Sequence, residues 1–204
     1  MKPFSLNISP LVSSPLPIDL DLVKAHCGVD GTDLDTLLER YTLAAIRWAE
    51  SALKRTLYQR AHVWTLPAFP VYPCAQIKLP RGKTVSVESI TYQSGGEAVE
   101  LSGPSSSPAG TGWREDLAPD SGGIIAPAYG AVWPVADADA PAPVVIEFVA
   151  GYPAGEIPAD ITHAILFAVK DMLDTRGSDD LTTFGKNLTT RVSLLSPYVL
   201  NRLH

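Results

Sequence analysis

The sequence predicts a mixed α+β protein, in which a small helical bundle carries a β-rich insertion at about residues 60–150. The chain has 204 residues, 46% of them hydrophobic, which is enough for a sizeable buried core. Its 18 prolines leave two long windows free, residues 18–66 and 159–196. Because a proline inside a helix costs about 3 kcal/mol, these windows are where long helices are expected.

We expect one domain over residues 1–204, made of four successive segments. Residues 1–17 are rich in proline and lack periodicity, which indicates an extended arm. Residues 18–58 and 158–204 are helical by pattern, and residues 59–157 between them form the β-rich insertion with long loops. We also expect the arm and residues 185–204 to become ordered only on assembly.

The first helical segment contains a short and a long helix. Residues 19–27 predict two helical turns that end at Gly28. A long helix follows over about 32–56, with Thr32 as its N-cap and acidic residues in its first turn. Its apolar face is formed by residues spaced three and four apart: Leu34, Leu37, Leu38, Tyr41, Ala44, Ala45, Trp48 and Ala52.

The middle segment changes to short apolar runs bounded by turn residues, which indicates β-strands. The sequence Ser94-Gly95-Gly96 predicts a hairpin turn between two of them. Residues 102–112 and 118–143 have the composition of loops, rich in proline, glycine and alanine. The predicted strands are Ala61–Leu66, Gln76–Leu79, Val85–Tyr92, Ala98–Leu101 and Val144–Val149.

The second helical segment begins with a helix over about 158–176. Pro158 suits a first helical turn, and Gly177 suits the position after the last one. Residues 188–203 repeat apolar side chains at helical spacing, but Pro197 lies inside them. The C-terminal helix is therefore either kinked or short.

Charge and cysteine usage exclude several function classes. The net charge of −6 arises in residues 61–157, with ten acidic and four basic residues, and no basic stripe suits a nucleic-acid backbone or a membrane surface. We therefore expect neither sequence-specific nucleic-acid binding nor membrane attachment. Cys27 and Cys74 lie far apart without nearby ligands, so they are expected to be reduced structural thiols.

No constellation of residues supports catalysis. His26 and Cys27 are adjacent, but neighbouring helical side chains do not face each other as a catalytic dyad requires. The other histidines lack partners at metal-ligand spacing, and no phosphate-binding or dinucleotide motif is complete. We therefore predict no catalytic residues, no metal site and no cofactor.

Aromatic residues are the remaining candidates for a binding role. Trp48 lies on the apolar face of the long helix and is expected in the core. Five others lie in or near the middle segment and are equally compatible with core packing or with a partner surface: Trp64, Trp113, Trp133, Tyr129 and Tyr152.

Three stretches resemble the head–tail connector (adaptor or head-completion) proteins of tailed phages, prophages and gene transfer agents. They are PIDLDLVKAHCGVDGTDLDTLLERYTLAAIRWAESALKRTL at 17–57, IKLPRGKTVSVESITYQSGGEAVEL at 77–101 and VVIEFVAGYPAGEIPADITHAILFAVKDMLDTRG at 144–177. The third stretch carries the most specific phrase. Residues 102–143 are longer than is typical of the family, and residues 178–204 match loosely.

The resemblance implies a non-enzymatic structural protein located at the head–tail junction of the virion, and in the host cytoplasm before assembly. It implies a ring of twelve copies under the portal protein, which extends the DNA channel and docks the next head-completion or tail protein. A ring needs two different faces of each protomer to meet. The candidate assembly contacts are Arg40, Arg47, Lys54, Asp171, Arg176, Tyr198 and Arg202.

Two alternatives stay open at this point. One is a monomeric phage-related binding module that uses its aromatic loops to contact a ligand or a host surface. The other is a hydrolase assembled from dispersed aspartate, serine and histidine residues, for which no motif argues.

Overall fold

The computed structural model divides the chain into two compact units. Unit 1 comprises Met1–Pro10 and Gln59–Gly151, and unit 2 comprises Leu11–Tyr58 and Tyr152–His204. Unit 1 holds the strands and unit 2 holds the helices, so the predicted α+β class is confirmed. That residues 1–204 form a single domain stays a prediction. The structure describes residues 5–10, 17–71, 76–103, 112–118, 120–153, 155–176 and 193–200.

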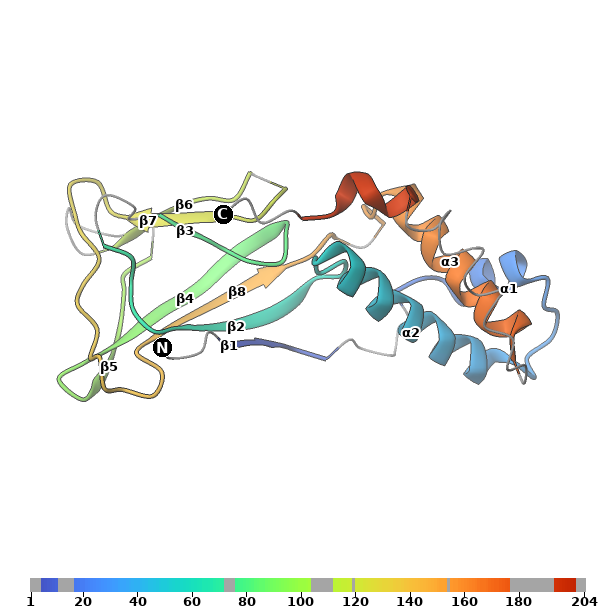
Figure 1. Cartoon of the computed structure of the whole chain (residues 1–204), viewed down its shortest axis with the longest axis horizontal. Helices are drawn as coiled ribbons and strands as arrows, with labels where there is room; N and C mark the ends of the chain where they lie inside the picture. The colour runs from blue at the N-terminus through green and yellow to red at the C-terminus, as the bar shows by residue number, and fades with distance from the viewer. Residues whose placement is uncertain are drawn as a thin grey trace. The chain divides into compact units, whose positions relative to one another are not determined.

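Unit 2 is built on three helices, α1 (Leu20–Cys27), α2 (Asp35–Leu53) and α3 (Ala159–Asp174). α2 and α3 pack along each other, and α1 contacts both (Figure 1). The two long helices were predicted from the spacing of their apolar residues, and both are present. The predicted apolar face of α2 is only partly correct: Ala44 and Ala52 are exposed, because the buried side of the helix is centred nearer to Ile46. The fully buried aliphatic side chains at the centre include Leu38, Ile46, Leu53, Ile161 and Ile165.

The ends of α1 follow the sequence signals. Asp19 is the N-cap, and its Oδ1 accepts a hydrogen bond from the backbone N–H of Asp21 at 3.1 Å. Gly28 ends the helix in the left-handed conformation with φ of 67°, a backbone geometry that glycine adopts without steric cost. The predicted stop at Gly28 is confirmed.

The start of α2 differs from the prediction. The helix begins at Asp35, and Leu34 occupies the N-cap position without a side-chain cap. Thr32 contributes its backbone carbonyl, which accepts from the Asp35 N–H at 3.2 Å, in a turn before the helix. The prediction of Thr32 as the N-cap is wrong because this turn places the first helical residue three positions later.

The remaining helical ends lie close to their predicted places. Pro158 is the N-cap of α3 rather than a residue of its first turn, and α3 ends at Asp174. Gly177 lies outside the described residues. Near the C-terminus, residues 193–195 are helical and continue into a short 3-10 helix, η1 (Ser196–Tyr198), which contains Pro197. In the described part of 188–203, the helix is therefore short.

Unit 1 contains two antiparallel sheets. The larger has the order β1-β2-β8-β4-β5, and the smaller has the order β3-β7-β6. β1 is Ser5–Ile8, β2 is Arg60–Leu66, β3 is Ile77–Lys78, β4 is Thr84–Ser94, β5 is Glu97–Glu100, β6 is Trp113–Asp116, β7 is Ile124–Pro127 and β8 is Val144–Ala150.

All five predicted strands are present, and β1, β6 and β7 were missed. The predicted hairpin joins β4 to β5, with Gly95 at φ 63° and Gly96 at φ 83°, as the tight turn of a two-residue hairpin requires. β1 lies in the segment expected to be an extended arm, but its residues pair with β2 in antiparallel register. The arm is thus part of the sheet at Ser5–Ile8.

The core of unit 1 lies against β4 and β8. Ile90, Ile146 and Phe148 are fully buried there. Loop residues complete this core, because the rings of Phe69 and Trp133 stack with their centroids 4.8 Å apart and an interplanar angle of 4°. The long loop before β8 is therefore anchored by a buried tryptophan.

Candidate assembly surface

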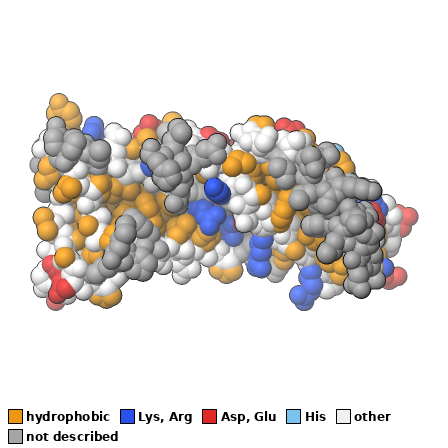
Figure 2. All heavy atoms as spheres, viewed as in Figure 1, with side chains coloured by type: hydrophobic (Ala, Val, Ile, Leu, Met, Phe, Trp, Pro, Cys, Tyr) orange, Lys and Arg blue, Asp and Glu red, His pale blue; other side chains and the backbone are white. Residues whose placement is uncertain are grey.

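The outer face of α2 carries a row of exposed residues, three of which are basic. Arg40, Ala44, Arg47, Ser51 and Lys54 are all exposed, and their spacing of four, three, four and three residues places them on one face. Figure 2 shows Lys and Arg side chains along the part of the surface where Figure 1 places α2. We call these five residues the α2 stripe.

The acidic residues of α2 do not contribute to this face. Asp35 is 2.9 Å from Lys24 Nζ in an ion pair with α1. Glu50 is buried, and its Oε1 accepts from the backbone N–H of Leu57 at 2.9 Å. Glu39 is half-buried. The exposed charges of α2 and its C-cap residue Lys54 are consequently all positive.

The other predicted assembly contacts differ in how exposed they are. Asp171 on α3 is only 7% exposed, so its carboxylate does not form part of the surface of unit 2. Arg176 is exposed after the end of α3, and Tyr198 is half-buried. Arg202 lies outside the described residues. Of the predicted set, Arg40, Arg47 and Lys54 are brought together on one face.

Tyr198 belongs to a network that holds the C-terminal segment against the end of α2. The buried Arg55 donates from Nε to the Tyr198 carbonyl at 2.6 Å and from Nη1 to the Tyr152 hydroxyl at 3.0 Å. The Leu200 N–H donates to the Leu53 carbonyl at 3.1 Å, and Leu195 is buried in the core. Residues 193–200 thus have partners within a single chain, which argues against ordering of this part only on assembly.

The exposed face of α1 has the opposite character. Its exposed residues are Asp21, Leu22 and Ala25, preceded by the exposed N-cap Asp19. Leu22 is 47% exposed and is the one large hydrophobic side chain exposed in the described part of unit 2. This face was not predicted from the sequence, although the acidic residues beside a leucine in a short helix are the available signal.

His26 and Cys27 do not form a catalytic pair. His26 points toward α3, where its ring centroid lies 5.7 Å from that of His163 and 5.4 Å from that of Phe167. Burial, followed by the nearby His163 and Lys170, lowers the pKa of His26. Cys27 is buried in the core, and burial raises the pKa of its thiol, so the reactive thiolate is disfavoured.

The aromatic residues of the middle segment are mostly core residues. Trp113, Trp133 and Tyr152 are buried, and Trp64 is half-buried. Trp48 on α2 is also half-buried, against the core of unit 2. Tyr129 alone of the five open cases is exposed, at 88%. This distribution weakens the alternative of a binding module that uses several aromatic loops.

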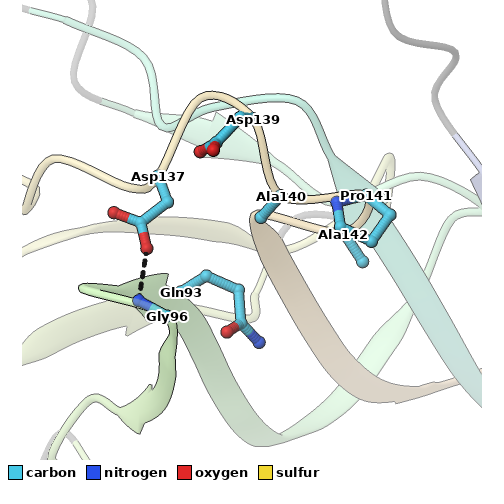
Figure 3. A pocket seen from close by; sticks show the side chains of 7 residues that line it. All are labelled: Gln93, Gly96, Asp137, Asp139, Ala140, Pro141 and Ala142. Carbon is cyan, nitrogen blue, oxygen red and sulfur yellow. Dashed lines mark hydrogen bonds between the residues drawn. The ribbon is translucent and has the colours of Figure 1, made fainter.

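Unit 1 has an open pocket whose Asp137 has a structural role. It is lined by Gln93, Gly96, Asp137, Asp139 and residues 140–142 (Figure 3). Asp137 joins the loop to the hairpin, because its Oδ2 accepts from the Gly96 N–H at 2.9 Å and its N–H donates to the Gln93 carbonyl at 2.9 Å. These lining residues include no nucleophile beside a base.

Two further properties of the described residues concern metal binding and membrane insertion. No group of three or more His, Cys, Asp and Glu residues there is arranged to hold a metal ion. Within the same residues, no helix has the length and apolar character needed to cross a membrane.

Part of the chain matches a known protein family. Residues 17–99 match the family of phage gp6-like head–tail connector proteins. The predicted resemblance is therefore confirmed. Connector proteins of this family are structural rather than enzymatic, which supports the prediction that the chain is not an enzyme. No curated protein sequence matches the chain.

Solved structures of the same fold come from the necks of gene transfer agent (GTA) particles. A chain of the neck of an empty GTA particle, computed with C6 symmetry, superposes with a TM-score of 0.72 at 21% identity. A chain of the native GTA virion gives a TM-score of 0.70 at 21% identity. Both matches cover 98% of this chain and 97% of the other, so the resemblance in fold extends over both units.

Proposed function

We propose that this protein is a structural head–tail connector that assembles into a ring in the neck of a phage, prophage or GTA particle. The observation that carries the proposal is the match of residues 17–99 to the connector family. The fold shared with GTA neck chains over 98% of this chain supports it, and one of those necks was computed with C12 symmetry. A ring of twelve copies at the head–tail junction is the corresponding arrangement.

In that position the ring extends the DNA channel beneath the portal protein and docks the next head-completion or tail protein. The surface charge of unit 1 suits a passage that DNA must traverse without being held. Its described residues expose eight acidic side chains and two basic ones, Lys78 and Arg114. Such a surface repels phosphates and does not grip a duplex.

The assembly contacts are formed by unit 2. Arg40, Arg47 and Lys54 stand exposed on one helical face, and Arg176 is exposed at the end of α3. Tyr198 acts indirectly in this proposal, since its carbonyl and hydroxyl bond to Arg55 and Asp160 and hold the C-terminal segment in place.

The test is reconstitution with the portal protein of the same phage, prophage or GTA. Negative-stain imaging and native mass spectrometry of the mixture should show a ring of this protein bound to one end of the portal. The arginine variant Arg40→Glu/Arg47→Glu should lose that ring, and Arg114→Glu in unit 1 is the matched control. A protein that stays monomeric and ignores the portal contradicts the proposal.

A further inference from the structure

We propose that neighbouring copies in the ring meet through two specific faces of unit 2: the exposed face of α1 on one copy and the α2 stripe on the next. The inference rests on the proposed function for its ring and adds the residues that join the copies. In the contact, Leu22 of one copy packs over Ala44 of the other, with Asp19 and Asp21 close to Arg40 and Arg47.

The charges of the two faces are complementary. The exposed charges on α1 and its N-cap are both acidic, Asp19 and Asp21, because Lys24 is half-buried in its ion pair with Asp35. The exposed charges on α2 and its C-cap are all basic. Two copies of the same α2 stripe repel each other, so this face selects a different face of its neighbour.

The shapes of the two faces are also complementary. Arg40 and Arg47 are seven residues apart, which is about 10.5 Å along a helix, and Ala44 lies between them. The side chain of Ala44 is a single methyl group, so it leaves room between the two long cationic side chains for an apolar side chain of the next copy. Leu22 offers a protruding apolar side chain, and Ala25 on the same side allows close approach of the helices.

The contact joins two different faces of unit 2, as the contact between neighbouring copies in a ring requires. α1 and α2 bury their inner sides in one core, Val23 and Cys27 from α1 and Leu38 and Ile46 among others from α2. Their exposed sides are therefore two distinct faces of unit 2, both available to neighbouring copies. Every pair joined through two different faces still has one free face of each kind, so the contact repeats from copy to copy. A closed ring forms when the rotation between neighbouring copies closes.

Site-specific crosslinking tests the contact directly. Leu22→Cys and Ala44→Cys are made separately in a full-length Cys74→Ser background, mixed in equal amounts and treated with a short bismaleimide. The buried Cys27 is retained, and the background protein alone measures its reactivity. The mixture should give a crosslinked dimer in excess of either variant alone, and the double variant should give a ladder of higher species.

Ala52→Cys provides the matched control. Ala52 is also exposed on α2, but it lies about 120° around the helix from the α2 stripe. We expect the Leu22→Cys and Ala44→Cys mixture to crosslink at least about fivefold more than the Leu22→Cys and Ala52→Cys mixture, the ratio that about 1 kcal/mol of preference produces. Raising the salt from about 0.05 to 0.5 M should reduce the specific product, because the pairing charges are exposed.

Equal crosslinking at Ala44 and Ala52, or none at either, overturns the inference. The portal reconstitution separates this result from a failure of the proposed function. A wild-type ring on the portal without the specific crosslink means that copies meet through other faces. A specific crosslink without portal binding supports the contact and removes the connector role.

Discussion

The two units differ in how charged residues are distributed over their surfaces. Unit 1 exposes acidic residues over several strands and loops, with few cations among its described residues to balance them. Unit 2 separates its charges, with exposed cations along α2 and exposed acidic residues on α1. A surface of one sign repels its own copies, whereas separated opposite charges attract them in a defined orientation. This difference is the basis for our proposal that copies of the chain meet through the helical unit.

The largest expected effect comes from removing one core side chain from each unit. Phe148→Ala in unit 1 should cost about 3–5 kcal/mol, and Leu53→Ala in unit 2 about 2–5 kcal/mol, since both are fully buried. Tryptophan fluorescence follows mainly unit 1, which holds Trp64, Trp113 and Trp133, and circular dichroism at the helical minimum follows unit 2. In urea, Phe148→Ala should lower the unfolding midpoint seen by fluorescence more than the midpoint seen by circular dichroism, and Leu53→Ala should do the reverse. Coincident shifts of both signals in both variants would show one cooperative domain.

A smaller effect is expected from the buried arginine of unit 2. Arg55→Met leaves the Tyr198 carbonyl and the Tyr152 hydroxyl without their donor, which should cost about 1–3 kcal/mol. Hydrogen exchange in residues 193–200 should become faster, while exchange in β8 stays unchanged. Arg47→Met is the control, because an exposed arginine should change the stability by less than about 0.5 kcal/mol. Unchanged exchange in residues 193–200 would show that the remaining contacts, among them buried Leu195 and the Leu200–Leu53 hydrogen bond, hold the segment without Arg55.

The smallest expected effect is a pH dependence of stability that is larger in unit 1 than in unit 2. His62 is buried and stacks on Phe148, and burial lowers its pKa from 6.5 to about 4. Its folded pKa lies below the unfolded value, so its neutral form stabilises the fold above about pH 6.5 and that contribution is lost as the pH falls toward 4.

The free energy of unfolding followed by fluorescence in urea should therefore decrease between about pH 7 and pH 4.5. The expected decrease, after screening by solvent, is of the order of 1–2 kcal/mol. The helical signal should change less, since the pKa of the half-buried His26 is also lowered but its ring lies nearer to solvent. His62→Gln should flatten the fluorescence profile. An equally steep profile in that variant would assign the pH dependence to another group.

The helices and the longer strands could be predicted because their patterns run over many residues. β6 was missed because it exposes Arg114, Glu115 and Asp116 in succession, which gives no alternation. β7 was missed because it lies within residues 118–143, whose composition is that of a loop. β1 was missed because its partner strand β2 lies more than fifty residues away in the sequence. Such pairing depends on tertiary context that local propensity does not contain.

The candidate surface could be predicted only in part. The polar positions of α2 correctly indicated Arg40, Arg47 and Lys54 as exposed. Asp171 was expected at the surface, but α3 contacts both other helices and is buried around most of its circumference. Leu22 was missed for the opposite reason, because an apolar residue in an amphipathic pattern is expected inside.

The chain leaves unit 2 after Tyr58 and returns to it at Tyr152, and these two residues are neighbours. They form a parallel bridge, and the Tyr152 N–H donates to the Leu57 carbonyl at 2.9 Å. An excursion whose two ends meet can be lengthened, shortened or exchanged without moving the helices that flank it. The junction is thus a natural point of exchange, at which recombination can replace residues 59–151 while the helical unit keeps its sequence.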